Sequence, residues 1–381
     1  MRLRALTCVL AAVALAGCGG SDADEAEAPP GDVLVVYTAL PLGGPGAERA
    51  RDILAGERLA LAQARGRAGP FEIRLRPLDD AAPEEGWEPG PTVDAARAAA
   101  ADPATIAYLG DVDAGATALS LPTTNALGIL QVSPATTYDG FTGGPSSTPG
   151  EPDKYQPSGM PTFGRIAPAD SVQAEEIVAL LADRGCRRLA VLSAPNAFDA
   201  SLAELVEEAA RRRGVRVVHS DQVRPDPESH ADAAADVVAA GAQCATLAAG
   251  PADLPAEVVQ ALHAADPELR IAVGLGLAHD AFARALGPAA EVTEIVGPPP
   301  PSEPFAAAFA REWGREPGPW AAYGHEAMRR VLDVLRRLGA GAGDREAVTR
   351  AYLDRYEPTG ALAVWRGGRA GLQLVRELPP A

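Results

Sequence analysis

The sequence predicts an α/β protein of two lobes, in which each lobe is a parallel β-sheet flanked by helices. Short apolar runs of strand length alternate with longer stretches of helical composition along most of the 381 residues. The first run, Val33 to Thr38, is continuously apolar, which is typical of a strand buried on both faces of a parallel sheet. A chain of this length can hold two domains, each with its own core.

The first lobe begins with the strand Val33–Thr38, which is followed by an amphipathic helix over 47–65. An alternating pattern over 71–78 predicts the second strand, and 93–101 has the composition of a helix. The next stretch, 106–137, contains a strand, a loop, a helix, a strand and a loop, in the order 106–109, 111–115, 116–127, 129–132 and 133–137. In an open α/β sheet ligands bind outside the carboxyl ends of the strands, so both of these loops are candidates for a small-molecule site.

The second lobe repeats the same pattern after a Gly-, Pro- and Ser-rich loop over 143–160. We expect Phe163–Ala167 to be a strand that crosses to this lobe. Its helices are expected at 171–184, 201–213, 231–240 and 256–265, and its strands at 189–192, 215–219, 245–248 and 271–274. Further helices are expected at 304–313 and 321–338, and a closing hairpin at 361–365 and 372–377.

The N-terminus has the pattern of a signal peptide with a lipobox. Arg2 and Arg4 precede an apolar segment over 5–16, and small residues lead to Cys18. The apolar segment is shorter than the roughly 20 residues that cross a membrane. We therefore expect cleavage before Cys18, a lipid on its thiol and an acidic tether over 18–31. This predicts an extracytoplasmic protein held at the cell membrane only by that lipid.

The charge of the chain excludes some partners. There are 34 Lys and Arg residues against 51 Asp and Glu residues, for a formal net charge of −17. Such an acidic chain is not expected to bind nucleic acid or to lie along an anionic membrane surface.

After processing, Cys186 and Cys244 would be the remaining cysteines, and each lies just before a predicted strand. If those strands are neighbours, the two cysteines lie side by side. An exported protein permits a disulfide between them, and two buried free thiols are the alternative.

The sequence gives little support to an enzyme. The five histidines are scattered without metal-ligand spacing, and no nucleophile-elbow motif is present. Gly274-x-Gly276 follows a predicted strand, but His279 occupies the third glycine position of a dinucleotide fingerprint. We therefore expect no catalytic residue, no metal and no cofactor.

Several motifs occur in the order seen in a known family: Leu42-Gly43-Gly44, Gly56, Leu78-Asp79-Asp80, Gly110, Ser133-Pro134-Ala135-Thr136-Thr137, Phe163 to Asp170 and Tyr323 to Met328. On these motifs the chain resembles the type I periplasmic binding proteins of the leucine/isoleucine/valine class, the substrate-binding subunits of ABC importers. The resemblance implies three crossover segments that form a hinge. It divides the chain into a signal peptide (1–17), a lipidated tether (18–31), a first lobe (32–165), a second lobe (166–295), a return to the first lobe (296–355) and closing strands of the second lobe (356–381).

The resemblance also assigns candidate ligand-binding residues. In the family, the loop that matches 133–137 binds the α-amino and α-carboxylate groups of an amino acid, here through Ala135 and the hydroxyl of Thr137. A family serine falls at the segment 113–115, where the chain has Asp113 instead, and an aspartate disfavours a carboxylate unless a cation pairs with it. A closing tyrosine aligns with Phe198. The full set of expected ligand residues is Leu42, Gly43, Asp113, Ala114, Gly115, Ala135, Thr136, Thr137, Phe198, Gly250 and Leu277.

Two family features are absent from the sequence. The acid that pairs with the ammonium group of the ligand would fall within 274–278, which holds no carboxylate, and an aromatic residue near Gly250 is also missing. A site that loses the partner of an ammonium group binds it poorly. The sequence therefore favours a ligand that is less polar, or differently charged, than a zwitterionic amino acid.

The expected function is that of a lipid-anchored, monomeric solute-binding protein, which closes over a small molecule and delivers it to the permease of an ABC importer. The small molecule is expected to be amino-acid-like or another small polar or carboxylate metabolite. The alternative is a surface lipoprotein of the same fold that senses a ligand for a signalling partner.

Overall fold

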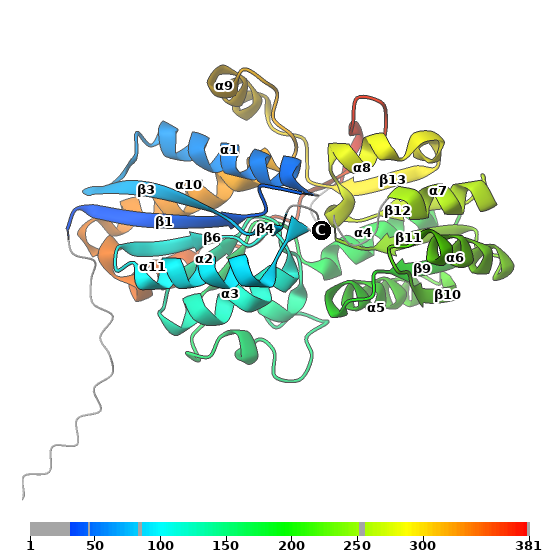
Figure 1. Ribbon diagram of the computed structural model, residues 1–381, viewed down its shortest axis with the longest axis horizontal. Helices are drawn as coiled ribbons and strands as arrows, with labels where there is room; N and C mark the ends of the chain where they lie inside the picture. The colour runs from blue at the N-terminus through cyan, green and yellow to red at the C-terminus, as the bar shows by residue number, and fades with distance from the viewer. Residues whose placement is uncertain (1–30, 45, 83–85, 251–255, 379–381) are drawn as a thin grey trace, which may run out of the picture.

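The computed structural model describes residues 31–44, 46–82, 86–250 and 256–378. Two α/β lobes lie side by side, the first on the left and the second on the right of Figure 1. The predicted signal peptide, Cys18 and all of the predicted tether except Gly31 lie outside the described residues. The α/β class predicted from the sequence is confirmed.

The first-lobe sheet has the strand order β2-β3-β1-β6-β7-β8, with every neighbouring pair parallel except β2 and β3. Its strands are β1 Val33–Leu40, β2 Arg67–Ala68, β3 Phe71–Asp79, β6 Thr105–Leu109, β7 Leu130–Ser133 and β8 Phe163–Arg165. A separate short ribbon pairs β4 Ala81–Ala82 with β5 Gly86–Trp87. From β1 the chain first adds β3 on one side and then β6 on the other. The direction in which strands are added therefore changes at β1.

Helices cover both faces of the first-lobe sheet (Figure 1). They are α1 Ala47–Gln63, α2 Pro89–Ala101, α3 Ala114–Ala126, α10 Ala321–Leu338 and α11 Arg345–Leu353. The helix α9 Glu303–Trp313 packs against α1 rather than on the sheet. Successive residues of β1 point to opposite faces. Val35 packs in one cluster with Ala95 of α2, whereas Val36 packs in another with Ile53 of α1 and Val331 of α10. The continuous apolar run of β1 is explained by this burial on both sides.

The second-lobe sheet has the order β10-β9-β11-β12-β13-β14-β15. Its strands are β9 Arg188–Ser193, β10 Arg216–Gln222, β11 Cys244–Ala248, β12 Arg270–Val273, β13 Thr293–Gly297, β14 Leu362–Arg366 and β15 Gln373–Leu378. Its helices are α4 Asp170–Asp183, α5 Ala197–Arg212, α6 Pro227–Ala239, α7 Ala256–Ala265 and α8 Asp280–Ala285. The predicted hairpin of β14 and β15 is confirmed, and it is antiparallel to β13, so the sheet is mixed.

Some elements differ from the prediction. The segment Phe163–Ala167 was expected to cross between the lobes, but its first three residues form β8, which pairs with β7 at the edge of the first-lobe sheet. The short helices α8 and α11 and the strand β13 were not predicted. The strand β13 lies at the start of the Pro-rich segment 294–304, where backbone pairing with β12 extends the sheet up to Gly297.

The chain passes between the lobes in three segments, 166–169, 298–302 and 354–361. Two of these segments are joined, because the backbone N–H of Thr359 donates to the backbone oxygen of Ile166 at 2.9 Å. Adjacent connections of this kind allow two lobes to rotate about a common hinge.

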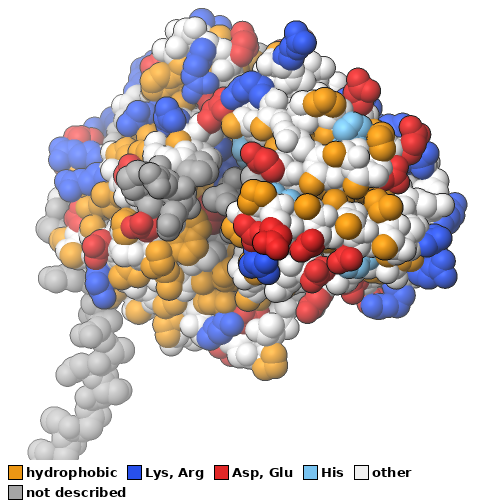
Figure 2. Space-filling model, turned by 45° about the vertical axis from the view of Figure 1, so that its right-hand side comes forward, with side chains coloured by type: hydrophobic (Ala, Val, Ile, Leu, Met, Phe, Trp, Pro, Cys, Tyr) orange, Lys and Arg blue, Asp and Glu red, His pale blue; other side chains and the backbone are white. Residues whose placement is uncertain are grey.

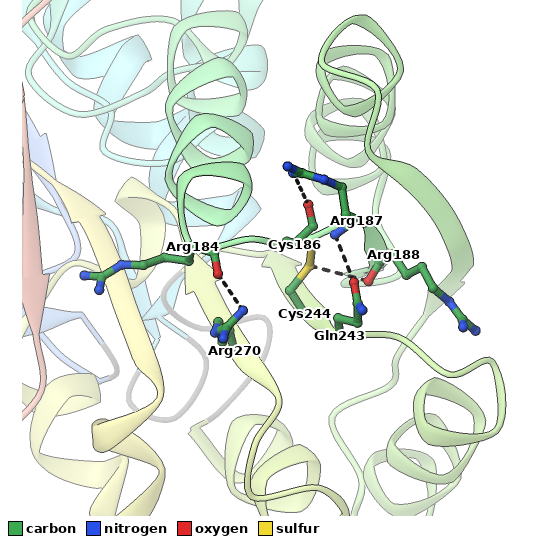
Figure 3. Close-up of a disulfide and its surroundings, with 7 residues drawn as sticks. All are labelled: Arg184, Cys186, Arg187, Arg188, Gln243, Cys244 and Arg270. Carbon is green, nitrogen blue, oxygen red and sulfur yellow. Dashed lines mark hydrogen bonds between the residues drawn. A yellow bond between two sulfur atoms is a disulfide. The ribbon is translucent and has the colours of Figure 1, made fainter.

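Cys186 and Cys244 form a disulfide in the second lobe, with their Cα atoms 6.0 Å apart (Figure 3). Strands β9 and β11 are neighbours, and Cys244 pairs in register with Leu189. The side chain of Gln243 accepts a hydrogen bond from the backbone N–H of Arg187 at 3.0 Å, beside the disulfide. Of the two alternatives that the sequence left open, the structure contains the bonded one.

Loss of this disulfide is expected to lower the free energy of unfolding by about 4 kcal/mol on the chain-entropy model, because the bond joins residues 58 positions apart. Urea denaturation of wild type and of the Cys186→Ala/Cys244→Ala variant measures the difference. Titration of thiols in the unfolded, unreduced protein is the direct check. Two reactive thiols would contradict the bond.

Candidate ligand-binding site

A cavity of about 420 Å³ lies between the two lobes. One wall comes from α1, β5, the N-terminal half of α3 and the loops after β6 and β7, and the other from the N-termini of α4 and α5 and the loops after β11 and β12. The lining residues are Arg49, Trp87, Val112, Asp113, Ala114, Gly115, Ala118, Leu119, Ala135, Thr136, Thr137, Asp170, Gln173, Asn196, Phe198, Asp199, Leu202, Ala249, Gly250 and Gly276. The cavity lies at the carboxyl ends of both sheets, where α/β proteins bind ligands.

The loops after β6 and β7 are joined by the side chain of Ser133. Its Oγ donates to the backbone oxygen of Asp111 and accepts from the backbone N–H groups of Ala135 and Thr136, at 3.2 and 2.9 Å. These bonds hold the segment 135–137 against the neighbouring loop. The hydroxyl of Thr136 is buried without a partner among the described residues and belongs to the cavity wall, so a ligand can bond to it.

Arg49 and Asp113 form an ion pair in the first-lobe wall, with Arg49 Nη2 3.4 Å from Asp113 Oδ1. The Arg49 guanidinium also stacks over the ring of Trp320, 5.1 Å from its centroid. Burial lowers the pKa of Arg49 and raises the pKa of Asp113, and the charge of each partner opposes the shift of the other. The wall therefore presents one cation and one anion side by side.

The second-lobe wall is organised by Asn196, the N-cap of α5. Its Oδ1 accepts from the backbone N–H groups of Phe198 and Asp199 at 3.0 and 2.9 Å, as expected of an N-cap asparagine. Its Nδ2 donates to Asp199 Oδ2 at 2.9 Å, and the backbone N–H of Gly250 donates to the same oxygen at 3.3 Å. A carboxylate is thus held at the cavity surface.

Asp170 and Gln173, in the first turn of α4, supply a further polar part of the wall. Gln173 Nε2 donates to Asp170 Oδ1 at 2.5 Å, and Gln173 Oε1 accepts from the backbone N–H of Leu275 at 2.9 Å. Burial raises the pKa of Asp170 to about 6. A Cβ at Gly274 would lie 2.4 Å from Gln173 Oε1, so glycine at that position lets the amide reach the cavity.

Phe198 connects the cavity to an aromatic cluster that contains Tyr138, Phe141 and, from the long loop over 143–160, Tyr155. Its ring lies edge-on to Tyr138, with centroids 5.0 Å apart, and 6.5 Å from the ring of Phe141. The buried carboxylate of Glu151 accepts from Tyr138 Oη at 2.8 Å and from Tyr155 Oη at 3.1 Å. The loop is therefore tied to Tyr138 through Glu151, and the aromatic cluster packs against Phe198, a second-lobe residue that lines the cavity.

Most of the ligand residues expected from the sequence lie together in this wall. They are Asp113, Ala114, Gly115, Ala135, Thr136, Thr137, Phe198 and Gly250. The other three do not line it. Leu42 packs against the core, and its backbone N–H donates to Asp79 Oδ1 at 3.0 Å. Gly43 lies beside Leu42. Leu277 is fully buried in the core of the second lobe, because its apolar side chain packs against other apolar residues there.

The polar and aromatic residues that sequence reasoning missed are Arg49, Trp87, Asp170, Gln173, Asn196 and Asp199. One local signal was available, because Asn196 followed by Asp199 is a recognisable helix start. Trp87 gave no such signal; only the structure places it against Gly115, where a Cβ would lie 2.4 Å from the indole ring. The absence of a carboxylate in 274–278 is also offset, because Asp170 and Asp199 bring carboxylates to the cavity from other segments.

Two α/β lobes joined by three segments, with a polar-and-apolar cavity between them, define a two-lobed ligand-binding protein. A family model described as periplasmic binding protein matches residues 38–354, and the chain belongs to that family. Members of this family bind solutes and are not enzymes.

Solved structures of the same fold agree with this assignment. An ABC transporter substrate-binding protein from Desulfitobacterium hafniense, in complex with Leu, has 18% identity and a TM-score of 0.71, covering 90% of this chain and 100% of its own. A solute-binding protein from R. palustris, in complex with benzoate, has 16% identity and a TM-score of 0.74, covering 92% and 97%. Comparison with the curated proteins gives no match.

Two features are absent from the described residues. Within 31–44, 46–82, 86–250 and 256–378, no helix is long and apolar enough to span a membrane. The same ranges contain no group of His, Cys, Asp and Glu side chains arranged to hold a metal ion. In Figure 2, acidic and basic side chains are interspersed over the second lobe on the face drawn, unlike a surface that carries a single basic stripe.

Proposed function

We propose that the chain is the solute-binding subunit of an ABC importer and that it binds an amino-acid-like small molecule with an apolar side chain. The observation that carries this proposal is the cavity between the lobes, whose lining combines polar groups with apolar side chains. Thr136, Thr137, Asp170 and Asp199 supply the polar groups, and Phe198 is one of the apolar walls. A ligand with a charged head and an apolar body matches this distribution.

The carboxylates of the second lobe support a ligand that carries an ammonium group. Asp170 and Asp199 both line the cavity, and each is held by hydrogen bonds from neighbouring groups. Fixed carboxylates can accept hydrogen bonds from an ammonium group without reorganisation. This revises the expectation from the sequence alone, which favoured a ligand without that group because the family acid is missing from 274–278.

Contacts across the cleft support binding by lobe closure. Arg284 of the second lobe lies 3.0 Å from Glu48 of the first, and Trp320 Nε1 donates to the backbone oxygen of Ala278 at 2.7 Å. A ligand that touches both walls adds to such contacts and shifts the population toward the closed form. The closed protein then presents both lobes to a permease, while the lipid on Cys18 keeps it, as a monomer, at the membrane.

Two alternatives remain to be distinguished from this proposal: a different class of ligand, and a sensor in place of an importer subunit. An aromatic carboxylate is favoured by the rings of Trp87 and Phe198, which both line the cavity. The Desulfitobacterium protein was solved with Leu and the R. palustris protein with benzoate, so both chemistries occur on this fold. A sensor lipoprotein would bind its ligand in the same way but would act on a signalling partner, and its gene neighbourhood would lack a permease and an ATPase.

Thermal melting of the purified protein against a ligand panel tests the proposal. The panel holds leucine, isoleucine, valine, other amino acids, their amides, short carboxylates and benzoates. A ligand at about 100 times its dissociation constant should add about 2.7 kcal/mol, or a few degrees of melting temperature. We expect the largest shift from an amino acid with an apolar side chain. A shift from benzoates alone would replace the proposed ligand, and no shift from any compound would contradict the importer role.

A further inference from the structure

Arg49 is a buried cation whose hydrogen-bonding capacity is not used up. The side chain is 3% exposed, and its Nε has no hydrogen-bond partner among the described residues. Its acidic contact is Asp113, through one nitrogen at 3.4 Å, which is long for a charge-assisted bond. A guanidinium offers five N–H donors in a fixed fork, and a buried donor without an acceptor costs free energy.

The side chain of Arg49 is held in place by its neighbours, although its Nε has no hydrogen-bond acceptor among the described residues. The guanidinium stacks over Trp320, which is 1% exposed and whose Nε1 donates to Ala278 of the second lobe. Arg49 lies in the first turn of α1 and lines the cavity together with Asp113. The fork is therefore held at the cavity wall by one ion pair and one stacking contact before any ligand enters.

We propose that Arg49 receives the carboxylate of the ligand, with Asp113 as its counter-ion, and thereby selects ligands with an anionic head group. This inference rests on the proposed function and assigns one end of the same cavity. It also accounts for Asp113 at the position of a family serine, since Asp113 compensates the charge of Arg49 while the cavity is empty. A buried cation without such a partner would be costly.

The two charged groups of the ligand bind to different lobes. The carboxylate of the ligand meets Arg49 and the hydroxyl of Thr136 in the first lobe, and its ammonium group faces Asp170 and Asp199 in the second. A molecule that bridges opposite charges across the cleft stabilises the closed form more than a molecule bound to one wall. Closure also buries Trp320 against Ala278, next to the stacked guanidinium.

The test compares each amino acid that shifts the melting temperature with its amide, starting with leucine and leucinamide. Calorimetric titration gives both dissociation constants for wild type, Arg49→Gln and Arg51→Gln. Wild type should bind the acid about 100-fold more tightly than the amide, because the amide leaves the guanidinium without an anionic partner. In Arg49→Gln this preference should fall below about 10-fold. Arg51→Gln, on the exposed side of the same turn, should behave as wild type.

Arg49→Gln leaves Asp113 buried without its partner and can fail to fold. The double variant Arg49→Gln/Asp113→Asn removes both charges and leaves no buried charge unpaired, and Asn keeps the size of Asp113, so it should fold and still lose the preference. If wild type binds acid and amide equally, or if both variants keep the 100-fold preference, Arg49 is not the carboxylate receptor although the protein still binds solutes. If no amino acid or amide binds wild type, the proposed function fails together with this inference.

Discussion

Replacing Gly56 by alanine is expected to lower the free energy of unfolding by about 3 kcal/mol. Gly56 lies on α1 where this helix crosses α10, and a Cβ there would lie 1.9 Å from the backbone oxygen of Ala321. Gly324, on α10, faces the same crossing, since its Cβ would lie 2.1 Å from the backbone oxygen of Ile53. Because the obstructing atoms belong to the backbone, no side-chain rotation relieves the clash, and the two helices must move apart.

Urea denaturation of Gly56→Ala and Gly324→Ala measures this cost, and Gly90→Ala is the matched control. Gly90 is an exposed residue of α2, and a Cβ there meets nothing within 4 Å. Alanine has a higher helix propensity than glycine, so the control should be equal to wild type or more stable by up to about 1 kcal/mol. If Gly56→Ala unfolded at the same urea concentration as Gly90→Ala, α1 and α10 would not pack at this distance.

The free energy of unfolding is expected to fall by an amount on the order of 4 kcal/mol between pH 6.5 and 8.5. Burial raises the pKa of Glu57 to about 8. Burial and the negative charges of Asp111 and Asp113 raise the pKa of Asp80 to about 8, and burial raises the pKa of Asp111 to about 7. All three acids have a pKa near 4 in an unfolded chain. The folded protein therefore holds protons that the unfolded chain has released, and raising the pH favours unfolding.

One buried group acts in the opposite direction at lower pH. Burial and the charges of Arg49 and Arg284 lower the pKa of His279 to about 4, so this residue adds stability as the pH rises from about 4 to 6.5. One histidine offsets only one of the protons held by the three acids, so the fall begins below pH 6.5, and above pH 6.5, where an unfolded histidine is already mostly neutral, nothing from His279 opposes it.

Urea denaturation at several pH values tests the effect, with Glu57→Gln, Asp80→Asn and the double variant. Glu57 is fully buried, and one of its oxygens has no partner among the described residues, as is true of both oxygens of Asp80. Neutral side chains at both positions should flatten most of the slope above pH 6.5. Glu257→Gln, at an exposed position of α7, is the control. A wild-type stability that stays constant or rises from pH 6.5 to 8.5 would contradict the prediction.

Much of the fold could be predicted because its signals are local. The strand β1 was expected at Val33–Thr38 from its apolar run and is observed at Val33–Leu40. The helix α10 was expected and is observed at Ala321–Leu338. The short helices α8 and α11 were missed, since six and nine residues give little helical periodicity. The strand β8 was placed in the wrong role because its partner β7 could not be identified from its own sequence.

The candidate site could be predicted only in part. The segments 113–115 and 135–137 follow apolar strands, and the carboxyl ends of parallel strands meet at one edge of a sheet, so their place in the wall was predictable. Arg49 gave no such signal, because a charged residue in an amphipathic helix usually faces solvent. Asp170 and Asp199 belong to helices of the other lobe, and nothing in the sequence places them opposite Thr136.

The sequence by itself determined the α/β class, the order of the elements and the loops that follow the central strands, because apolar periodicity and turn residues act over a few neighbouring positions. The tertiary structure alone decided which side chains share the cavity. Three crossing segments bring the two lobes together, and that packing buries Arg49 beside Asp113 and Trp320. Burial then changes the pKa values and leaves donors without partners, since both effects depend on the exclusion of water by residues far apart in the chain.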